Sequence, residues 1–61
     1  MSQLNQIELQ NLRHLIGSHE MTFKKLSDYA SQCQDSQVKQ VFQQSAQDAK
    51  STKDQLMTFL G

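Results

Sequence analysis

The stretch Leu12–Ala30, LRHLIGSHEMTFKKLSDYA, decides the fold of this chain, because its apolar residues recur at alternating steps of four and three. This spacing lines them up on one side of an α-helix that lies nearly parallel to a neighbouring helix. Extended in both directions, the row consists of Leu9, Leu12, Ile16, His19, Phe23, Leu26, Ala30 and Cys33. His19 interrupts the apolar row, and Glu20 follows it. The residues that face this pair therefore decide whether it forms a chemically active site.

Start signals precede this row. Asn5 can cap a helix, with Glu8 returning the second hydrogen bond of a capping box. We therefore expect Met1–Gln3 to fray and the first helix to run from about residue 6 to about residue 33. Gly17 lies inside it and costs roughly 1 kcal/mol relative to alanine. It is either a tolerated weak point, with a slight bend, or a place where another helix backbone comes close.

Residues 32–36, QCQDS, interrupt the row and predict a turn. Asp35 and Ser36 both favour a helix N-cap, so we place the turn at about 34–35 and a second, antiparallel helix at about 36–60. Gly61 follows where a C-cap glycine would lie. The row of the second helix again advances in fours and threes, and it comprises Val38, Phe42, Ser45, Ala49, Thr52, Leu56 and Phe59.

Folding the chain at this turn predicts an approximate register between the helices. Ala30 lies opposite Phe42 and His19 opposite Thr52, so that large residues face small ones in the middle layers. The residues expected to pack in the core or at a dimer contact are Leu12, Ile16, His19, Phe23, Leu26, Phe42, Ala49, Leu56 and Phe59. The fold class predicted is an all-α antiparallel helical hairpin, forming a single domain over residues 1–61.

More apolar residues remain than one interface between two helices can cover. They flank the two rows, at Leu15, Thr22 and Tyr29 and at Val41, Met57 and Leu60. A chain of 61 residues also buries too little surface to be comfortably stable, and one cysteine excludes an internal disulfide. We therefore expect two hairpins to associate as a homodimer with four helices.

Composition excludes several function classes. Six basic and six acidic residues give a net charge of zero, which argues against binding to nucleic acid or to anionic membranes. There is no apolar run of 18 residues and no signal-peptide pattern, so we expect a soluble protein that is made in the cytoplasm. No nucleophile constellation and no glycine-rich phosphate loop is present, so we expect neither an enzyme nor a cofactor.

Isolated reactive side chains have simpler interpretations. Lys24-Lys25 and Lys50-x-x-Lys53 alternate with aspartates and read as solvated helix faces rather than as a basic patch. Cys33 near the turn reads as a small apolar filler, with a cross-linking thiol as the alternative.

Glu20 and His19 are weak candidates for metal ligands. Bundles that hold two metal ions need a glutamate from one helix and a Glu-x-x-His pair from its neighbour. The register instead places Ala49 and Thr52 opposite, and neither ligates well. We prefer a hydrogen-bonded core histidine that sets the register, with an exposed histidine as the remaining alternative.

Four short motifs resemble the Coat F family, which comprises small spore coat proteins of endospore-forming Gram-positive bacteria. They are Leu15-Ile16-x-x-His19-Glu20, Lys24-Lys25-Leu26-x-x-Tyr29-Ala30, the run DSQVK at 35–39 and the run VFQQ-x-A at 41–46. The resemblance covers about residues 9–60. It implies a ferritin-like four-helix bundle, a structural role in the spore coat and other coat proteins as partners. Longer family members carry this bundle in one chain, whereas a 61-residue hairpin would assemble it from two. It also matches Glu20 to the metal carboxylate of the first helix, while Ala49 and Thr52 depart from the family pattern.

Three functions therefore follow from the sequence. The first is a non-enzymatic, dimeric structural protein of the spore coat. The second is a reduced ferritin-like protein that binds metal through Glu20 and His19. The third is a small hairpin adaptor that binds RNA, which would need a continuous basic or aromatic face.

Overall fold

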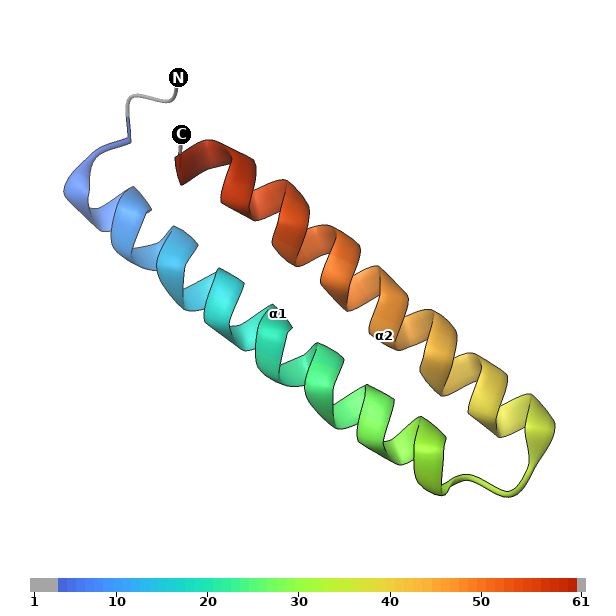
Figure 1. The fold of residues 1–61 in the computed structure, drawn as a ribbon. Helices are drawn as coiled ribbons and strands as arrows, with labels where there is room; N and C mark the ends of the chain where they lie inside the picture. The colour runs from blue at the N-terminus through green and yellow to red at the C-terminus, as the bar shows by residue number, and fades with distance from the viewer. Residues whose placement is uncertain (1–3, 61) are drawn as a thin grey trace.

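The computed structural model describes residues 4–60 as two antiparallel helices joined by a short turn (Figure 1). Helix α1 spans Gln6–Gln32 and helix α2 spans Ser36–Met57, followed by the short 3-10 helix η1 at Thr58–Leu60. The predicted all-α antiparallel hairpin is confirmed. The predictions for Met1–Gln3 and for Gly61 lie outside the described residues.

Both helices begin at side chains that the sequence indicates. The Asn5 side chain accepts a hydrogen bond from the Glu8 N–H at 2.7 Å, and the Glu8 carboxylate accepts one from the Asn5 N–H at 3.1 Å. The predicted capping box is thus confirmed. At α2 the Asp35 carboxylate accepts bonds from the N–H groups of Gln37 and Val38, at 2.9 and 3.0 Å. Asp35, rather than Ser36, is therefore the N-cap.

The carboxyl ends of the helices differ from the expected bounds by a few residues. Helix α1 ends at Gln32, and Cys33 turns the chain with extended backbone while its N–H donates to the Ala30 carbonyl at 3.2 Å. Helix α2 changes to 3-10 geometry after Met57, and the Thr58 hydroxyl donates to the Gln55 carbonyl at 2.6 Å. Such tightening is common in a last turn, because it satisfies carbonyls that have no helical partner.

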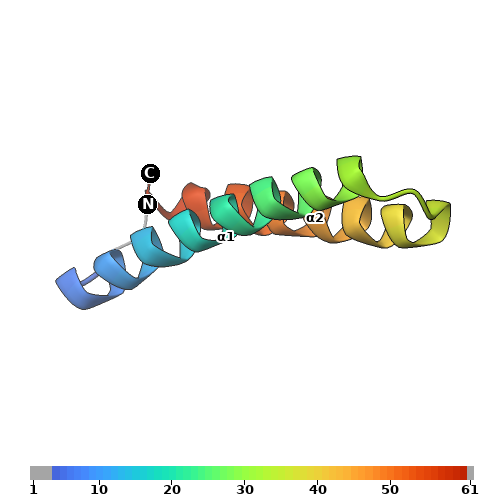
Figure 2. The ribbon, with the colours of Figure 1, turned by 90° about the horizontal axis from the view of Figure 1, so that it is seen from below.

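The hairpin is a thin rod of 46 × 15 × 11 Å, with both chain ends opposite the turn. Seen from the edge, the helices form one layer and cross at a shallow angle (Figure 2). Within the described residues no helix is long and apolar enough to cross a membrane. A single layer has no second layer to cover it, so each helix is shielded on one side only.

The core is correspondingly small, and its buried members are Leu12, Ala30, Ala46 and Ala49. The rest of the predicted α1 row is half-buried, as are Phe42, Ser45, Thr52 and Leu56 of α2. Two positions of the predicted α2 row are more open, since Val38 is 45% exposed and Phe59 is 51% exposed. Ala46, which was not in the predicted row, takes a core position instead.

Two contacts between the helices agree with the approximate register that the sequence predicts. The Lys53 ammonium lies 2.7 Å from the Glu20 carboxylate, next to the predicted pair of His19 and Thr52. At the turn end the rings of Tyr29 and Phe42 lie 6.0 Å apart, next to the predicted pair of Ala30 and Phe42.

Candidate interaction surface

Two unlike flanks border the interface between α1 and α2. In an antiparallel pair of helices, each flank of one helix meets the corresponding flank of the other. We call the first flank the charged side, and it consists of Arg13, Glu20, Ser27, Lys39, Ala46 and Lys53. We call the second the apolar face, and it consists of Leu15, Tyr29, Val38, Val41 and Phe59, with the half-buried His19 at its inner edge.

A network of ion pairs covers the middle of the charged side. The Lys53 Nζ donates to Glu20 Oε2 at 2.7 Å, and the Lys24 Nζ lies 3.6 Å from Glu20 Oε1. Lys53 also lies 4.0 Å from Asp54, which pairs with Lys50 at 3.4 Å. The Lys53 side chain is only 20% exposed, because its methylene stem crosses from one helix to the other.

The contact between Glu20 and Lys53 shifts both groups towards their charged forms. The hydrogen bond from Lys53 lowers the pKa of Glu20 from its ordinary value, and the charges of Lys53 and Lys24 add to this effect against partial desolvation. The same hydrogen bond raises the pKa of Lys53. The expectation that the lysines form only solvated faces is therefore wrong for Lys53. The predicted pair of His19 and Thr52 immediately precedes Glu20 and Lys53 in the sequence, and this adjacency is the signal that could have revealed the ion pair.

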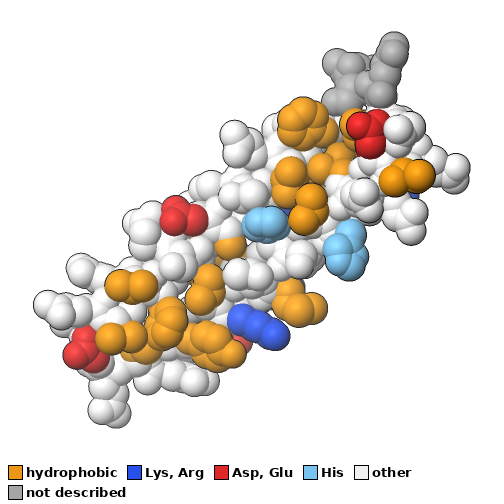
Figure 3. All heavy atoms as spheres, turned by 180° about the vertical axis from the view of Figure 1, so that it is seen from behind, with side chains coloured by type: hydrophobic (Ala, Val, Ile, Leu, Met, Phe, Trp, Pro, Cys, Tyr) orange, Lys and Arg blue, Asp and Glu red, His pale blue; other side chains and the backbone are white. Residues whose placement is uncertain are grey.

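The apolar face leaves large side chains in solvent. Figure 3 shows that its hydrophobic side chains gather in two clusters, one at each end of the rod, with the histidines between them. At the turn end, Tyr29 is 50% exposed and packs against Phe42, while Val41 is 62% exposed. At the end opposite the turn, a shallow groove is lined by the apolar residues Leu4, Leu12, Leu15, Leu56 and Phe59 together with Glu8 and Asn11.

His19 lies between these two clusters and is half-buried. Its Nδ1 lies 2.8 Å from the Leu15 carbonyl oxygen, which can only accept, so Nδ1 is the donor. The predicted hydrogen bond of this histidine is confirmed. Its acceptor lies one turn earlier on the same helix, however, so this bond does not set the register between the helices.

The candidate metal ligands are not brought together into a site. Within residues 4–60 there is no group of three or more His, Cys, Asp or Glu side chains that could hold a metal ion. Glu20 is held between the ammonium groups of Lys53 and Lys24, and the buried methyl of Ala49 lies on the facing helix. Cys33 is a free, half-buried thiol at the turn. It follows the last residue of α1 and lies far along the chain from Glu20.

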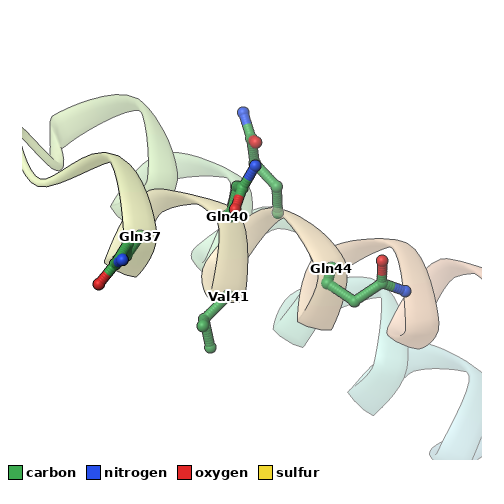
Figure 4. A pocket seen from close by; sticks show the side chains of 5 residues that line it. Gln37, Gln40, Val41 and Gln44 are labelled. Carbon is green, nitrogen blue, oxygen red and sulfur yellow. The ribbon is translucent and has the colours of Figure 1, made fainter.

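A hollow on the outer surface of α2 offers no chemistry either. It is lined by Gln37, Gln40, Val41, Gln43 and Gln44. Figure 4 shows that the labelled side chains all leave the same helix and do not converge on a common point. Amides spread along one helix supply no nucleophile and no titratable group.

Comparison with protein-family models, with curated proteins and with solved structures found no match for this chain. The resemblance to the Coat F family stays a prediction.

Proposed function

We propose that this protein is a non-enzymatic structural protein that works as a dimer of helical hairpins, in which two copies close a four-helix bundle. The observation that carries the proposal is the amount of surface that one hairpin leaves uncovered. Its exposed large hydrophobic side chains are Ile7, Leu15, Met21, Tyr29, Val38, Val41, Met57, Phe59 and Leu60.

The accessible surface of one hairpin is 4956 Å² for a mass of 7.0 kDa. A compact monomer of this mass exposes about 4,000 Å², so the hairpin exposes roughly 900 Å² more. A standard protein–protein interface removes about 800 Å² from each partner. The excess is therefore of the size that one partner of stable affinity would cover.

The dimensions of the rod agree with this view. The radius of gyration is 14.2 Å, whereas a compact chain of this length has a radius of about 10.5 Å. A compact chain of twice the length has a radius of about 13.7 Å. The radius of gyration of one hairpin is thus already that of a compact chain of twice its length, as expected if a second copy lies beside it.

The spore coat is the setting that we propose for this dimer, and the support for it is the resemblance to the Coat F family at residues 9–60. The resemblance implies a ferritin-like bundle, which two hairpins would assemble between them. A helical rod with an exposed apolar face is suited to a coat, where proteins pack against each other and against other coat proteins.

The side chains do not favour the other two functions. Metal binding through Glu20 would have to displace Lys53 and Lys24 from the carboxylate. An RNA adaptor would need a continuous face of free cations, whereas three of the six cations, Lys24, Lys50 and Lys53, are paired with Glu20 and Asp54 and the net charge is zero.

Sedimentation equilibrium of the purified protein over the micromolar range tests the dimer. We expect a mass of about 14 kDa, twice the 7.0 kDa of one chain. A mass of one chain throughout this range would overturn the proposal. Location of the protein in purified spore coats tests the setting separately, because a dimer that is absent from the coat would contradict only the spore assignment.

A further inference from the structure

We infer that the second copy docks on the apolar face, made of Leu15, Tyr29, Val38, Val41 and Phe59, and that the charged side stays in solvent. This inference rests on the proposed dimer and specifies the surface through which it forms. The two flanks and the outer surface of the hairpin are the possible contact regions, and the structure distinguishes them by the charge and by the apolar area that each would bury.

The charged side is an unfavourable surface to bury. Docking there would take the network of Lys24, Glu20, Lys53, Asp54 and Lys50 out of water. Removing charges from water is expensive unless each one gains a matched partner, and three ammonium groups in this network share two carboxylates. Arg13 and Lys39 add further positive charge on the same flank.

The apolar face carries fewer charges that would need to be desolvated. By helical position, Lys25 borders it one turn before Tyr29, and the other bordering charged residues in the described chain are the acids Glu8 and Asp48. Both already have hydrogen-bond partners within their own helix, since Glu8 accepts from the Asn5 N–H and Asp48 accepts from the Gln44 amide at 3.0 Å. His19 is likewise bonded at Nδ1, so covering it leaves only Nε2 to satisfy.

The apolar face also has the side chains that stabilise interfaces. Tyr29 stands at one end and Phe59 at the other, and aromatic residues in such positions are the usual anchors of association. Tyr29 already packs on the Phe42 ring, so binding a partner requires less ordering of this side chain. A twofold dimer uses the same patch on both copies, so each of these contacts is made twice.

The outer surface of α1 is a poor alternative. Its exposed apolar residues are Ile7 and Met21, which are 59% exposed or more. They lie 14 residues apart, about 21 Å along the helix, with His14 between them. Two isolated side chains at this separation do not make a continuous contact surface.

Two matched lysine substitutions test the inference. Val41→Lys places a charge on the apolar face, and Met21→Lys places the same charge on the outer surface of α1. The two positions have similar exposure, 62% and 59%, and both variants change the net charge by +1. Neither side chain is buried in the hairpin, and lysine is a good helix former, so the fold of each chain is expected to remain.

The dissociation constant of the dimer is measured by sedimentation equilibrium, with helicity followed by far-ultraviolet circular dichroism. We expect Val41→Lys to raise this constant at least tenfold and Met21→Lys to change it less than twofold. Leu15→Lys, on the other helix and in the other cluster, is expected to act like Val41→Lys.

A wild-type dimer that Val41→Lys and Leu15→Lys both leave intact would overturn the choice of face and keep the proposed function. An equal weakening by Met21→Lys would also overturn it, because the charge alone would then explain the loss. A wild-type protein that is monomeric throughout would instead contradict the proposed function itself.

Discussion

The charged side and the apolar face border the same interface between helices, but they complete their contacts in different ways. On the charged side Lys53 reaches across to Glu20 and Ala46 is buried, so the middle of this flank makes its contacts within one chain. On the apolar face Val41 and Phe59 remain more than half exposed. One flank of the hairpin therefore joins its own two helices, while the other keeps apolar surface exposed.

The charged side also holds the helices in the register that the turn sets. Among the described residues, the bond between Lys53 and Glu20 is the only hydrogen bond that links α1 to α2. Apolar contacts tolerate a shift along the helix, whereas an ion pair with a short hydrogen bond does not. In the described residues, the half-exposed apolar face contains no hydrogen bond between the helices. It contributes apolar contact area between them but no contact that fixes their register.

The largest change in the free energy of unfolding is expected from substitutions of two leucines on α1. Leu12 is buried between the helices and Leu15, three residues later, is 45% exposed on the apolar face. Leu12→Ala removes buried methyl groups and should lower the free energy of unfolding by about 2 kcal/mol or more. Leu15→Ala should lower it by less than half as much when urea unfolding is followed at concentrations where monomers dominate.

At protein concentrations where the dimer forms, the effect of Leu15→Ala should become larger, because Leu15 then contributes to the contact between copies. Leu15→Ala should weaken the dimer, whereas Leu12→Ala should act mainly through the stability of each hairpin. Equal losses for the two variants in the monomer would show that Leu15 is covered within the hairpin as fully as Leu12, and the apolar face would then offer no such surface to a second copy.

Much of the fold follows from the sequence because its signals are local. The capping box of Asn5 and Glu8 and the N-cap at Asp35 each involve residues within three positions of one another. The spacing of apolar residues in α1 identifies the covered side of that helix, since its whole predicted row is buried or half-buried. With the turn fixed by these caps, the register between the helices follows from counting residues.

The contacts that the sequence did not predict depend on how α2 rotates about its own axis. A seven-residue pattern alone does not decide whether Ser45 or its neighbour Ala46 lies deeper in the interface. The structure turns α2 so that Ala46 is buried, and the same rotation leaves Val38 and Phe59 half exposed and carries Lys53 towards Glu20. The hydrogen bond of His19 to its own helix is similarly a rotamer choice, which spacing does not reveal.

A smaller change in stability is expected from the substitution of Gly17. A Cβ added at Gly17 would meet nothing within 4 Å, so no other backbone comes close to it within the hairpin. Gly17→Ala should therefore stabilise the hairpin by about 1 kcal/mol, because alanine has the higher helix propensity. Thermal unfolding measured by circular dichroism checks the sign and the size.

The same variant reports on the docking of the second copy. By helical position Gly17 lies away from the apolar face, so the dissociation constant of the dimer should be unchanged in Gly17→Ala. A weaker dimer would mean that a helix of the second copy approaches Gly17, which is incompatible with docking on the apolar face.

The smallest effect is expected from the ion pair of Glu20 and Lys53, because both side chains keep access to water and salt screens them. The pKa of Glu20 is lowered from 4.5 in the folded chain, so its contribution to stability is present above that value and is lost as the pH falls through the lowered pKa. The pKa of Lys53 is raised from 10.5, so the same contribution is lost again as the pH rises through the raised pKa. Between these limits wild type should be more stable than Glu20→Gln by a constant amount.

Urea unfolding of both proteins as a function of pH measures this difference directly. The two stabilities should converge at the acid end, because a protonated Glu20 is equivalent to glutamine in charge. Asp28→Asn, which removes an exposed carboxylate elsewhere on α1, provides the control for net charge. If the gap between wild type and Glu20→Gln matched the gap for Asp28→Asn at every pH, the pair would contribute nothing specific to the hairpin. The register would then have to come from apolar packing alone, and the charged side would lose the role that separates it from the apolar face.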